Sequence, residues 1–152
     1  MDGETNYKKN TYIPNLKKGN EYEEFVGIKL KDIINIELVF FKTKKEQYNI
    51  GESLQGFEIK FDDKFIKTGN LYIEYQEKSN PNNINYINSG ILREDNTWMY
   101  CVGDYNGVFL MQKSVLKAIF KNNKHKKIET TTSRGFLYKG SDAKILFKYI
   151  KF

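Results

Sequence analysis

This chain of 152 residues is poor in the side chains that most often build soft-metal sites and nucleophilic triads. It has a single cysteine, Cys101, and a single histidine, His125. One cysteine excludes an internal disulfide and any zinc cluster of several cysteines. One histidine excludes metal hydrolase sites and HNH-type nuclease sites that need several. The chemistry must therefore rest on carboxylates, lysines, amides and hydroxyls, which favour hard cations such as Mg²⁺ or Mn²⁺.

Long hydrophobic runs are absent as well. The run from Ile33 to Phe41 is too short and too interrupted to span a bilayer. The first ten residues, MDGETNYKKN, do not have the charged and then apolar order of a secretory signal. We therefore expect a cytoplasmic protein that has no membrane partner.

The composition is that of a folded protein with a basic surface. Hydrophobic residues make up 39% and charged residues 29% of the chain, which is enough for one core. We expect a polar N-terminal arm over residues 1–20 and a single domain over residues 21–152. The net charge of +6 suits a polyanionic partner such as nucleic acid, but solvated surface lysines would produce the same excess.

Apolar periodicity predicts a mixed α/β chain. Spacings of three and four from Glu21 to Ile34 predict an amphipathic helix, with a weaker preference for its extension through Phe41 and then a polar connection over residues 42–49. An Asn-Gly pair between two apolar runs predicts a β-hairpin. The later elements predicted are strands over 97–102 and 108–112, a helix over 115–121 capped by Ser114, a strand over 135–138, and a strand or short helix over 144–152.

The stretch from Gly51 to Lys78 combines strand periodicity with many charges. In residues 57–62 and 71–78 apolar side chains alternate with charged or polar ones, so each strand has one apolar and one polar face. A chain-reversal signal at residues 68–70 predicts that the two strands pair as an antiparallel hairpin. Such pairing places Asp62 and Glu74 on one polar face. Like charges opposed on a sheet are destabilising, and a divalent cation between them would relieve the repulsion.

The order helix, three strands, helix, strand resembles the PD-(D/E)XK nuclease superfamily. The residues that carry the resemblance are Asp62 in EIKFD and the tripeptide Glu74-Tyr75-Gln76 in YIEYQEK, with Glu52 in IGES as an additional acidic residue. It spans roughly residues 21–139, but only the predicted hairpin holds motif-level information. The resemblance implies an α/β (α+β) fold with a restriction-endonuclease-like core, in which helices flank a central mixed β-sheet in the order αβββαβ.

The resemblance also implies a metal site. Asp62, Glu74 and the backbone carbonyl of Tyr75 are its expected ligands for Mg²⁺ or Mn²⁺. Gln76 stands where the family usually has a lysine and would orient the attacking water or a phosphate oxygen. Lys78 or Lys60 would then supply the missing ammonium.

A second assignment treats Glu58-Ile59-Lys60 as the acidic-x-lysine tripeptide. Its partner carboxylate would be Glu23 or Glu24 on the first helix, or Glu52. This assignment supplies the usual lysine, but it leaves Glu74 on the neighbouring strand without a role.

The function implied is hydrolysis of phosphodiester bonds in DNA, by an endonuclease rather than an exonuclease. The family occurs in phage, mobile-element and restriction systems, so a phage-encoded protein would work in the bacterial host cell, and a homodimer would allow both strands to be cut. Two other functions stay open from the residues alone: a non-catalytic nucleic-acid-binding module and a protein-interaction domain.

Overall fold

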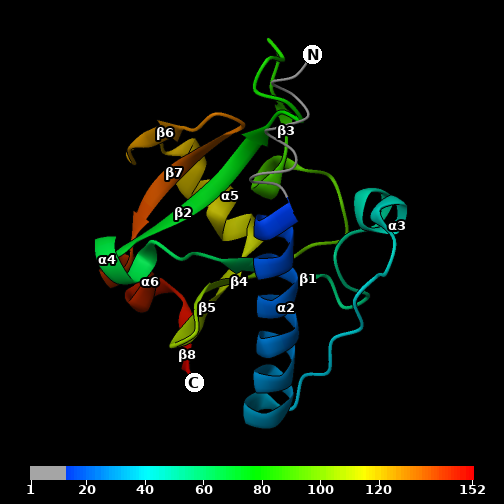
Figure 1. Ribbon diagram of the computed structural model, residues 1–152. Coiled ribbons are helices and arrows are strands. Elements are labelled where there is room, and N and C mark those ends of the chain that lie inside the picture. Colours follow the sequence, from blue (N-terminus) through cyan, green and yellow to red (C-terminus); the bar gives the residue numbers. More distant parts are fainter. Residues whose placement is uncertain (1–12) are drawn as a thin grey trace.

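The computed structural model describes residues 13–152 (Figure 1). Most of the predicted arm, residues 1–12, lies outside the described residues, and residues 13–20 belong to a helix. The helices are α2 (Ile13–Ile34), α3 (Lys44–Asn49), α4 (Phe65–Thr68), α5 (Lys113–Lys121) and α6 (Gly140–Leu146), with a 3₁₀ turn over Gly90–Leu92. The strands are β1 (Phe57–Phe61), β2 (Asn70–Glu77), β3 (Ile87–Asn88), β4 (Met99–Asp104), β5 (Gly107–Gln112), β6 (Lys127–Glu129), β7 (Ser133–Lys139) and β8 (Lys148–Lys151).

The mixed α and β class is confirmed, but the strands form two sheets instead of one central sheet. One sheet has the order β1-β4-β5-β8 and the other the order β3-β2-β7-β6. The predicted hairpin between residues 57–62 and 71–78 is wrong. β1 pairs in parallel with β4, whereas β2 is paired on one side with β7 and on the other with β3. β7 therefore pairs along the whole of β2, β3 pairs with it at Gln76 and Glu77 alone, and β1 pairs with neither edge.

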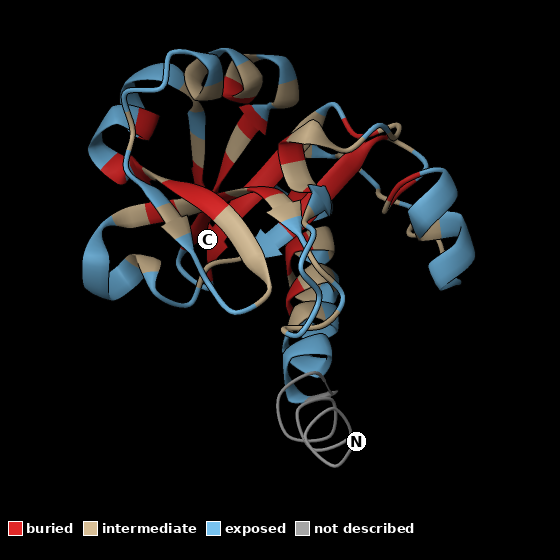
Figure 2. Cartoon of the chain, turned by 90° about the horizontal axis from the view of Figure 1, so that it is seen from above, coloured by how far each residue is buried: buried red, intermediate tan, exposed pale blue. Residues whose placement is uncertain are grey.

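Two apolar clusters hold the layers together. The first fills the space between the two sheets and includes Phe109, Leu116 and Phe136. The second lies between α2 and the other face of the first sheet. Successive side chains of β4 point to opposite faces of the first sheet, so they contribute to different clusters. Tyr100 and Val102 belong to the first cluster and the intervening Cys101 to the second. Figure 2 shows the buried residues concentrated along these strands, with exposed residues around them.

Helix α2 covers the first sheet with one apolar stripe. Tyr22, Val26 and Leu30 follow one another at intervals of four residues and are all fully buried. The helix ends at Ile34, because Asn35 adopts a left-handed backbone conformation with φ of 56°. The predicted extension of the helix through Phe41 is therefore wrong, and α3 forms within the segment that was expected to be a polar connection.

The second half of the chain agrees well with its prediction. β4 and β5 form the expected hairpin, and α5 and β7 lie where a helix and a strand were predicted. The cap of α5 differs, since the helix begins at Lys113 and its N-cap, Gln112, makes no side-chain capping hydrogen bond. The final segment contains both predicted alternatives, α6 followed by β8. Among residues 13–152, no helix is both long enough and apolar enough to cross a membrane.

Candidate functional site

A lysine and a glutamate two residues apart on β1 form the centre of the candidate site. Side chains two apart on a strand lie on the same face, and Glu58 and Lys60 both point away from the face that packs on α2. Lys60 Nζ lies 2.6 Å from Glu58 Oε1, and Glu58 Oε2 accepts a hydrogen bond of 3.3 Å from Thr97 Oγ1. Glu58 is almost completely buried, while the Lys60 side chain is 46% exposed. The adjoining Glu58 carboxylate raises the pKa of Lys60 above its usual value, so the lysine stays charged.

Two more carboxylates lie close enough to Lys60 to interact with it electrostatically. Glu23 comes from α2 and Glu52 from the loop before β1. The pKa of Glu23 is raised to about 7, chiefly by burial and next by the Glu52 carboxylate, while Lys60 opposes the change. Burial also raises the pKa of Glu52, with Glu58 as the next cause. We call Lys60 with Glu23, Glu52 and Glu58 the Lys60 cluster.

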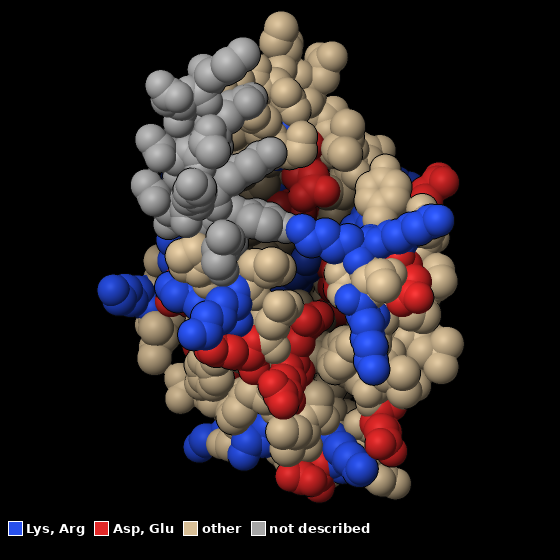
Figure 3. Space-filling view, turned by 45° about the vertical axis from the view of Figure 1, so that its right-hand side comes forward, with Lys and Arg blue, Asp and Glu red and all other residues tan. Residues whose placement is uncertain are grey.

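The Lys60 cluster borders two cavities. One, of about 490 Å³, is lined by Glu23, Glu52 and Lys60 on the side of α2. The other, of about 440 Å³, lies between the two sheets and is also lined by Lys60. Lys60 can border both because β1 is the edge strand of its sheet. Figure 3 shows acidic side chains gathered in the middle of one face of the molecule, with lysine and arginine side chains on either side.

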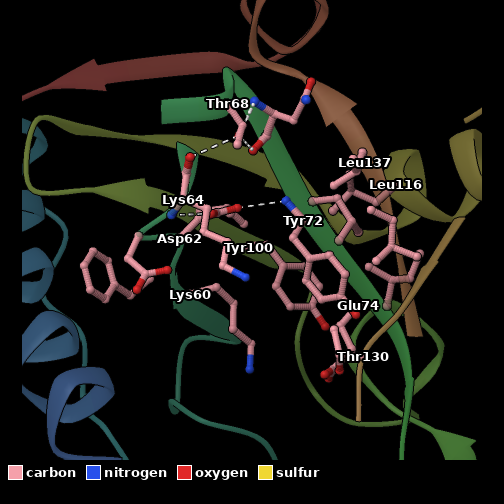
Figure 4. A pocket seen from close by; sticks show the side chains of 18 residues that line it. Lys60, Asp62, Lys64, Thr68, Tyr72, Glu74, Tyr100, Leu116, Thr130 and Leu137 are labelled. Atoms are coloured by element: carbon pink, nitrogen blue, oxygen red, sulfur yellow. Dashed lines mark hydrogen bonds between the residues drawn. The ribbon is translucent and has the colours of Figure 1, made fainter. Parts of the chain in front are cut away.

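Asp62 and Glu74, the predicted metal pair, both line the cavity between the sheets, although no hairpin joins them (Figure 4). Asp62 Oδ2 accepts a hydrogen bond of 2.8 Å from the Tyr72 amide, and Oδ1 one of 3.2 Å from the Lys64 amide. Burial raises the pKa of Asp62, and these two amides oppose the change. Asp62 thus connects the end of β1 to the start of β2 through its hydrogen bond with the Tyr72 amide. Metal binding by this pair stays a prediction.

Glu74 lies on the cavity side of Lys60. Its Oε2 accepts a hydrogen bond of 3.0 Å from Ser89 Oγ. Burial raises the pKa of Glu74, while Lys60 lowers it. A carboxylate has lone pairs for about four hydrogen bonds, so the Glu74 group retains acceptor capacity towards the cavity.

The remaining predicted residues on β2 have other partners. The Tyr75 side chain is buried in the core, and its carbonyl accepts a hydrogen bond of 3.1 Å from the Ser89 amide. Gln76 Oε1 accepts one of 3.2 Å from Arg134 Nη1. Lys78 Nζ lies 4.7 Å from the centre of the Tyr86 ring. The structure therefore places Gln76 and Lys78 in a separate group around Arg134 and Tyr86.

Several residues of the site were not identified from the sequence. Tyr100 lines the cavity between the sheets, and the β1–β4 pairing makes it the register partner of Glu58. Thr97 and Ser89 hold Glu58 and Glu74 through their hydroxyls. No local pattern marks these three positions, since their roles depend on which strands pair. Of the two neighbouring helix candidates, Glu23 is half-buried and belongs to the Lys60 cluster, whereas Glu24 is exposed.

The donor atoms of the Lys60 cluster suit a hard divalent cation. Glu23, Glu52 and Glu58 offer only carboxylate oxygens. After burial, the Glu52 carboxylate is the next cause of the raised pKa of Glu23, and the Glu58 carboxylate is the next cause of the raised pKa of Glu52. A bound cation would offset this repulsion. Within residues 13–152, no three acidic, histidine or cysteine side chains are already arranged as a metal-binding group. Binding would therefore require movement of these side chains.

Comparison with known proteins identifies no relative. The chain matches no protein-family model, no curated protein and no solved structure. Its function is therefore inferred from the geometry and chemistry of the site.

Proposed function

We propose that the chain is a Mg²⁺- or Mn²⁺-dependent nuclease that hydrolyses phosphodiester bonds in DNA, with the Lys60 cluster as its active site. The observation that supports this proposal is the gathering of the Glu58-Ile59-Lys60 tripeptide with carboxylates from a preceding helix and loop. This is the second assignment made from the sequence, and it retains the resemblance to the PD-(D/E)XK nucleases. The proposal includes a restriction-endonuclease-like core, in which helix α2 places a carboxylate beside the strand that holds the tripeptide.

Glu23, Glu52 and Glu58 are the residues that would hold the cation. When bound, a divalent cation neutralises phosphate charge and lowers the pKa of a bound water. Glu58 would have to exchange its ion pair with Lys60 for this role. The Lys60 ammonium would then be free to interact with a phosphate oxygen and to stabilise the charge that develops there.

Glu23 is close to half protonated at pH 7 when no cation is bound, because its pKa is about 7. A divalent cation binds the carboxylate form, so binding at Glu23 would displace this proton. Glu23 is therefore assigned a role as a ligand and not as a general acid or base.

The test is cleavage of supercoiled plasmid and of single-stranded DNA in the presence of Mg²⁺ or Mn²⁺. We expect Glu58→Gln and Lys60→Met to lose roughly 100-fold or more in rate, as happens when groups at a transition state are removed. The matched control is Asp32→Asn, which neutralises an exposed carboxylate on α2 and should cleave like the wild type. Undiminished cleavage by both cluster variants would refute the site.

The variant Glu74→Gln tests which of the two sets of carboxylates holds the metal, the Lys60 cluster or the pair Asp62 and Glu74. If Glu74→Gln abolishes cleavage while Glu58→Gln does not, the pair Asp62 and Glu74 is the metal site. Salt-sensitive DNA binding without cleavage by the wild-type chain would instead identify a non-catalytic nucleic-acid-binding module. Sedimentation of the chain with and without DNA tests whether a homodimer forms.

A further inference from the structure

The cavity between the two sheets has the properties of a small-ligand site. Its volume of about 440 Å³ falls within the range of about 300–1,000 Å³ typical of such sites. Apolar side chains from both sheets and from α5 form much of its wall, among them Ile73, Val102 and Leu116. A few polar groups face it as well, and Figure 4 shows Lys60, Tyr72, Glu74 and Tyr100 around the same space.

One buried polar atom of this wall has no partner. Tyr100 is 3% exposed, and its phenolic oxygen makes no hydrogen bond with any described residue. A buried hydroxyl without a hydrogen bond is costly, and native proteins satisfy nearly all such groups. The Tyr100 side chain lines the cavity, but its oxygen is enclosed by protein atoms. A polar atom of a ligand in the cavity would supply the missing bond once the phenol turns towards it.

The charges around the cavity favour a neutral ligand over a phosphate. Asp62, Asp63 and Glu74 contribute three negative charges, against two positive charges from Lys60 and Lys64. Lys60 is in addition already paired with Glu58. A ligand that offers N–H donors to Glu74 and a carbonyl oxygen to Lys60 or Tyr100 fits these groups better than an anion does.

A nucleobase has this combination of a flat apolar face and a polar edge. We propose that the cavity between the sheets receives one unpaired nucleobase, with its N–H edge on Glu74 and its carbonyl towards Lys60 and the Tyr100 hydroxyl. Enzymes that read an extruded base use such hydrogen bonds together with aromatic and apolar walls, and carboxylates accept from exocyclic amines. Tyr72 supplies an aromatic side chain beside Glu74 (Figure 4).

This inference rests on the proposed function for the identity of the substrate, and it narrows that substrate to strands with unpaired nucleotides. Guanine carries ring and exocyclic N–H donors beside a carbonyl, whereas uracil has no exocyclic amine. Guanosine is therefore expected to bind more tightly than uridine.

The test is a ligand-observed NMR titration of the full chain with guanosine and uridine, without metal. We expect guanosine to bind, Tyr100→Phe to weaken binding roughly 3- to 10-fold, the effect of one hydrogen bond, and Leu137→Trp, which fills the cavity, to abolish it. The matched control, Tyr48→Phe, removes the hydroxyl of an exposed tyrosine outside the cavity and should bind like the wild type.

Absence of guanosine binding to the wild type, or unchanged binding by both Tyr100→Phe and Leu137→Trp, would overturn the proposal. Tyr100→Phe keeps the ring, so its binding remains informative if Leu137→Trp does not fold. A nucleoside has no phosphodiester bond to cleave. Nucleoside binding without nuclease activity would therefore refute only the proposed function, and DNA cleavage without nucleoside binding would refute only this inference.

Discussion

Neutralising Glu23 should stabilise the protein at alkaline pH and leave its stability at acid pH almost unchanged. The carboxyl group is half-buried on α2, and burial is the main cause of its raised pKa, with the carboxylates of Glu52 and Glu58 adding to it and Lys60 opposing. The charged form of Glu23 is therefore less stable in the folded protein than in the unfolded chain. Glu23→Gln keeps the size of the side chain and removes the charge.

The sign of the effect follows from the two pKa values. The folded protein binds a proton at Glu23 with a pKa of about 7, against the ordinary value of 4.5 in the unfolded chain. The stabilisation that comes from binding this proton is fully present below the pKa of the unfolded chain. It is lost as the pH rises through the pKa of the folded protein. The difference corresponds to roughly 3 kcal/mol, and because the side chain is partly in contact with water, we expect about 1–2 kcal/mol.

Urea denaturation at pH 4 and pH 8, in the presence of a chelator, measures this difference. Glu23→Gln should unfold with a free energy about 1–2 kcal/mol higher than the wild type at pH 8, and with nearly the same free energy at pH 4. Glu24→Gln, an exposed neighbour on the same helix, is the control and should follow the wild type at both values. An equal effect of both substitutions at both pH values would refute the assigned environment of Glu23.

Three further substitutions test the packing around the site, each by urea denaturation. Asp62→Ala should lower the free energy of unfolding by about 2 kcal/mol, because the Tyr72 amide loses a charged acceptor at 2.8 Å. Tyr22→Phe should cost about 1–2 kcal/mol, since it removes the buried hydrogen bond of 2.8 Å from the phenol to the Asp104 carbonyl. Leu116→Ala, at a fully buried position, should cost about 2–5 kcal/mol. An unchanged unfolding midpoint in any of the three would contradict the corresponding contact.

Periodicity predicted which segments become strands but not how the strands pair. Burial alternates along β2 as predicted, because alternation depends only on which face of a strand is buried. In β1 the apolar Phe57 and Ile59 are buried as predicted, but Glu58 between them is buried as well. The partner of β1 is β4, whose register partners lie 42 residues further along the chain, as in Glu58↔Tyr100. A parallel pair of this kind has no turn signal, whereas the β4–β5 hairpin does, so the hairpin could be predicted and the parallel pair could not.

In the candidate site too, local spacing predicts some of the contacts and the packing of distant segments determines the others. The adjacency of Glu58 and Lys60 follows from a spacing of two residues on one strand. The approach of Glu23 and Glu52 depends on how α2 and the preceding loop pack at the edge of a sheet, so the sequence could name them only as alternatives. The hydroxyl of Tyr100 that has no hydrogen-bond partner could not be predicted, because its surroundings depend on how both sheets form and pack.

The most direct test of the Lys60 cluster as a metal site is anomalous X-ray diffraction from crystals of the chain soaked in Mn²⁺. If the Lys60 cluster holds the cation, we expect an anomalous peak bound by carboxylate oxygens of Glu23, Glu52 and Glu58, with Lys60 moved away from Glu58. A peak between Asp62 and Glu74, or no peak at either place under conditions in which the protein cleaves DNA, would contradict this assignment.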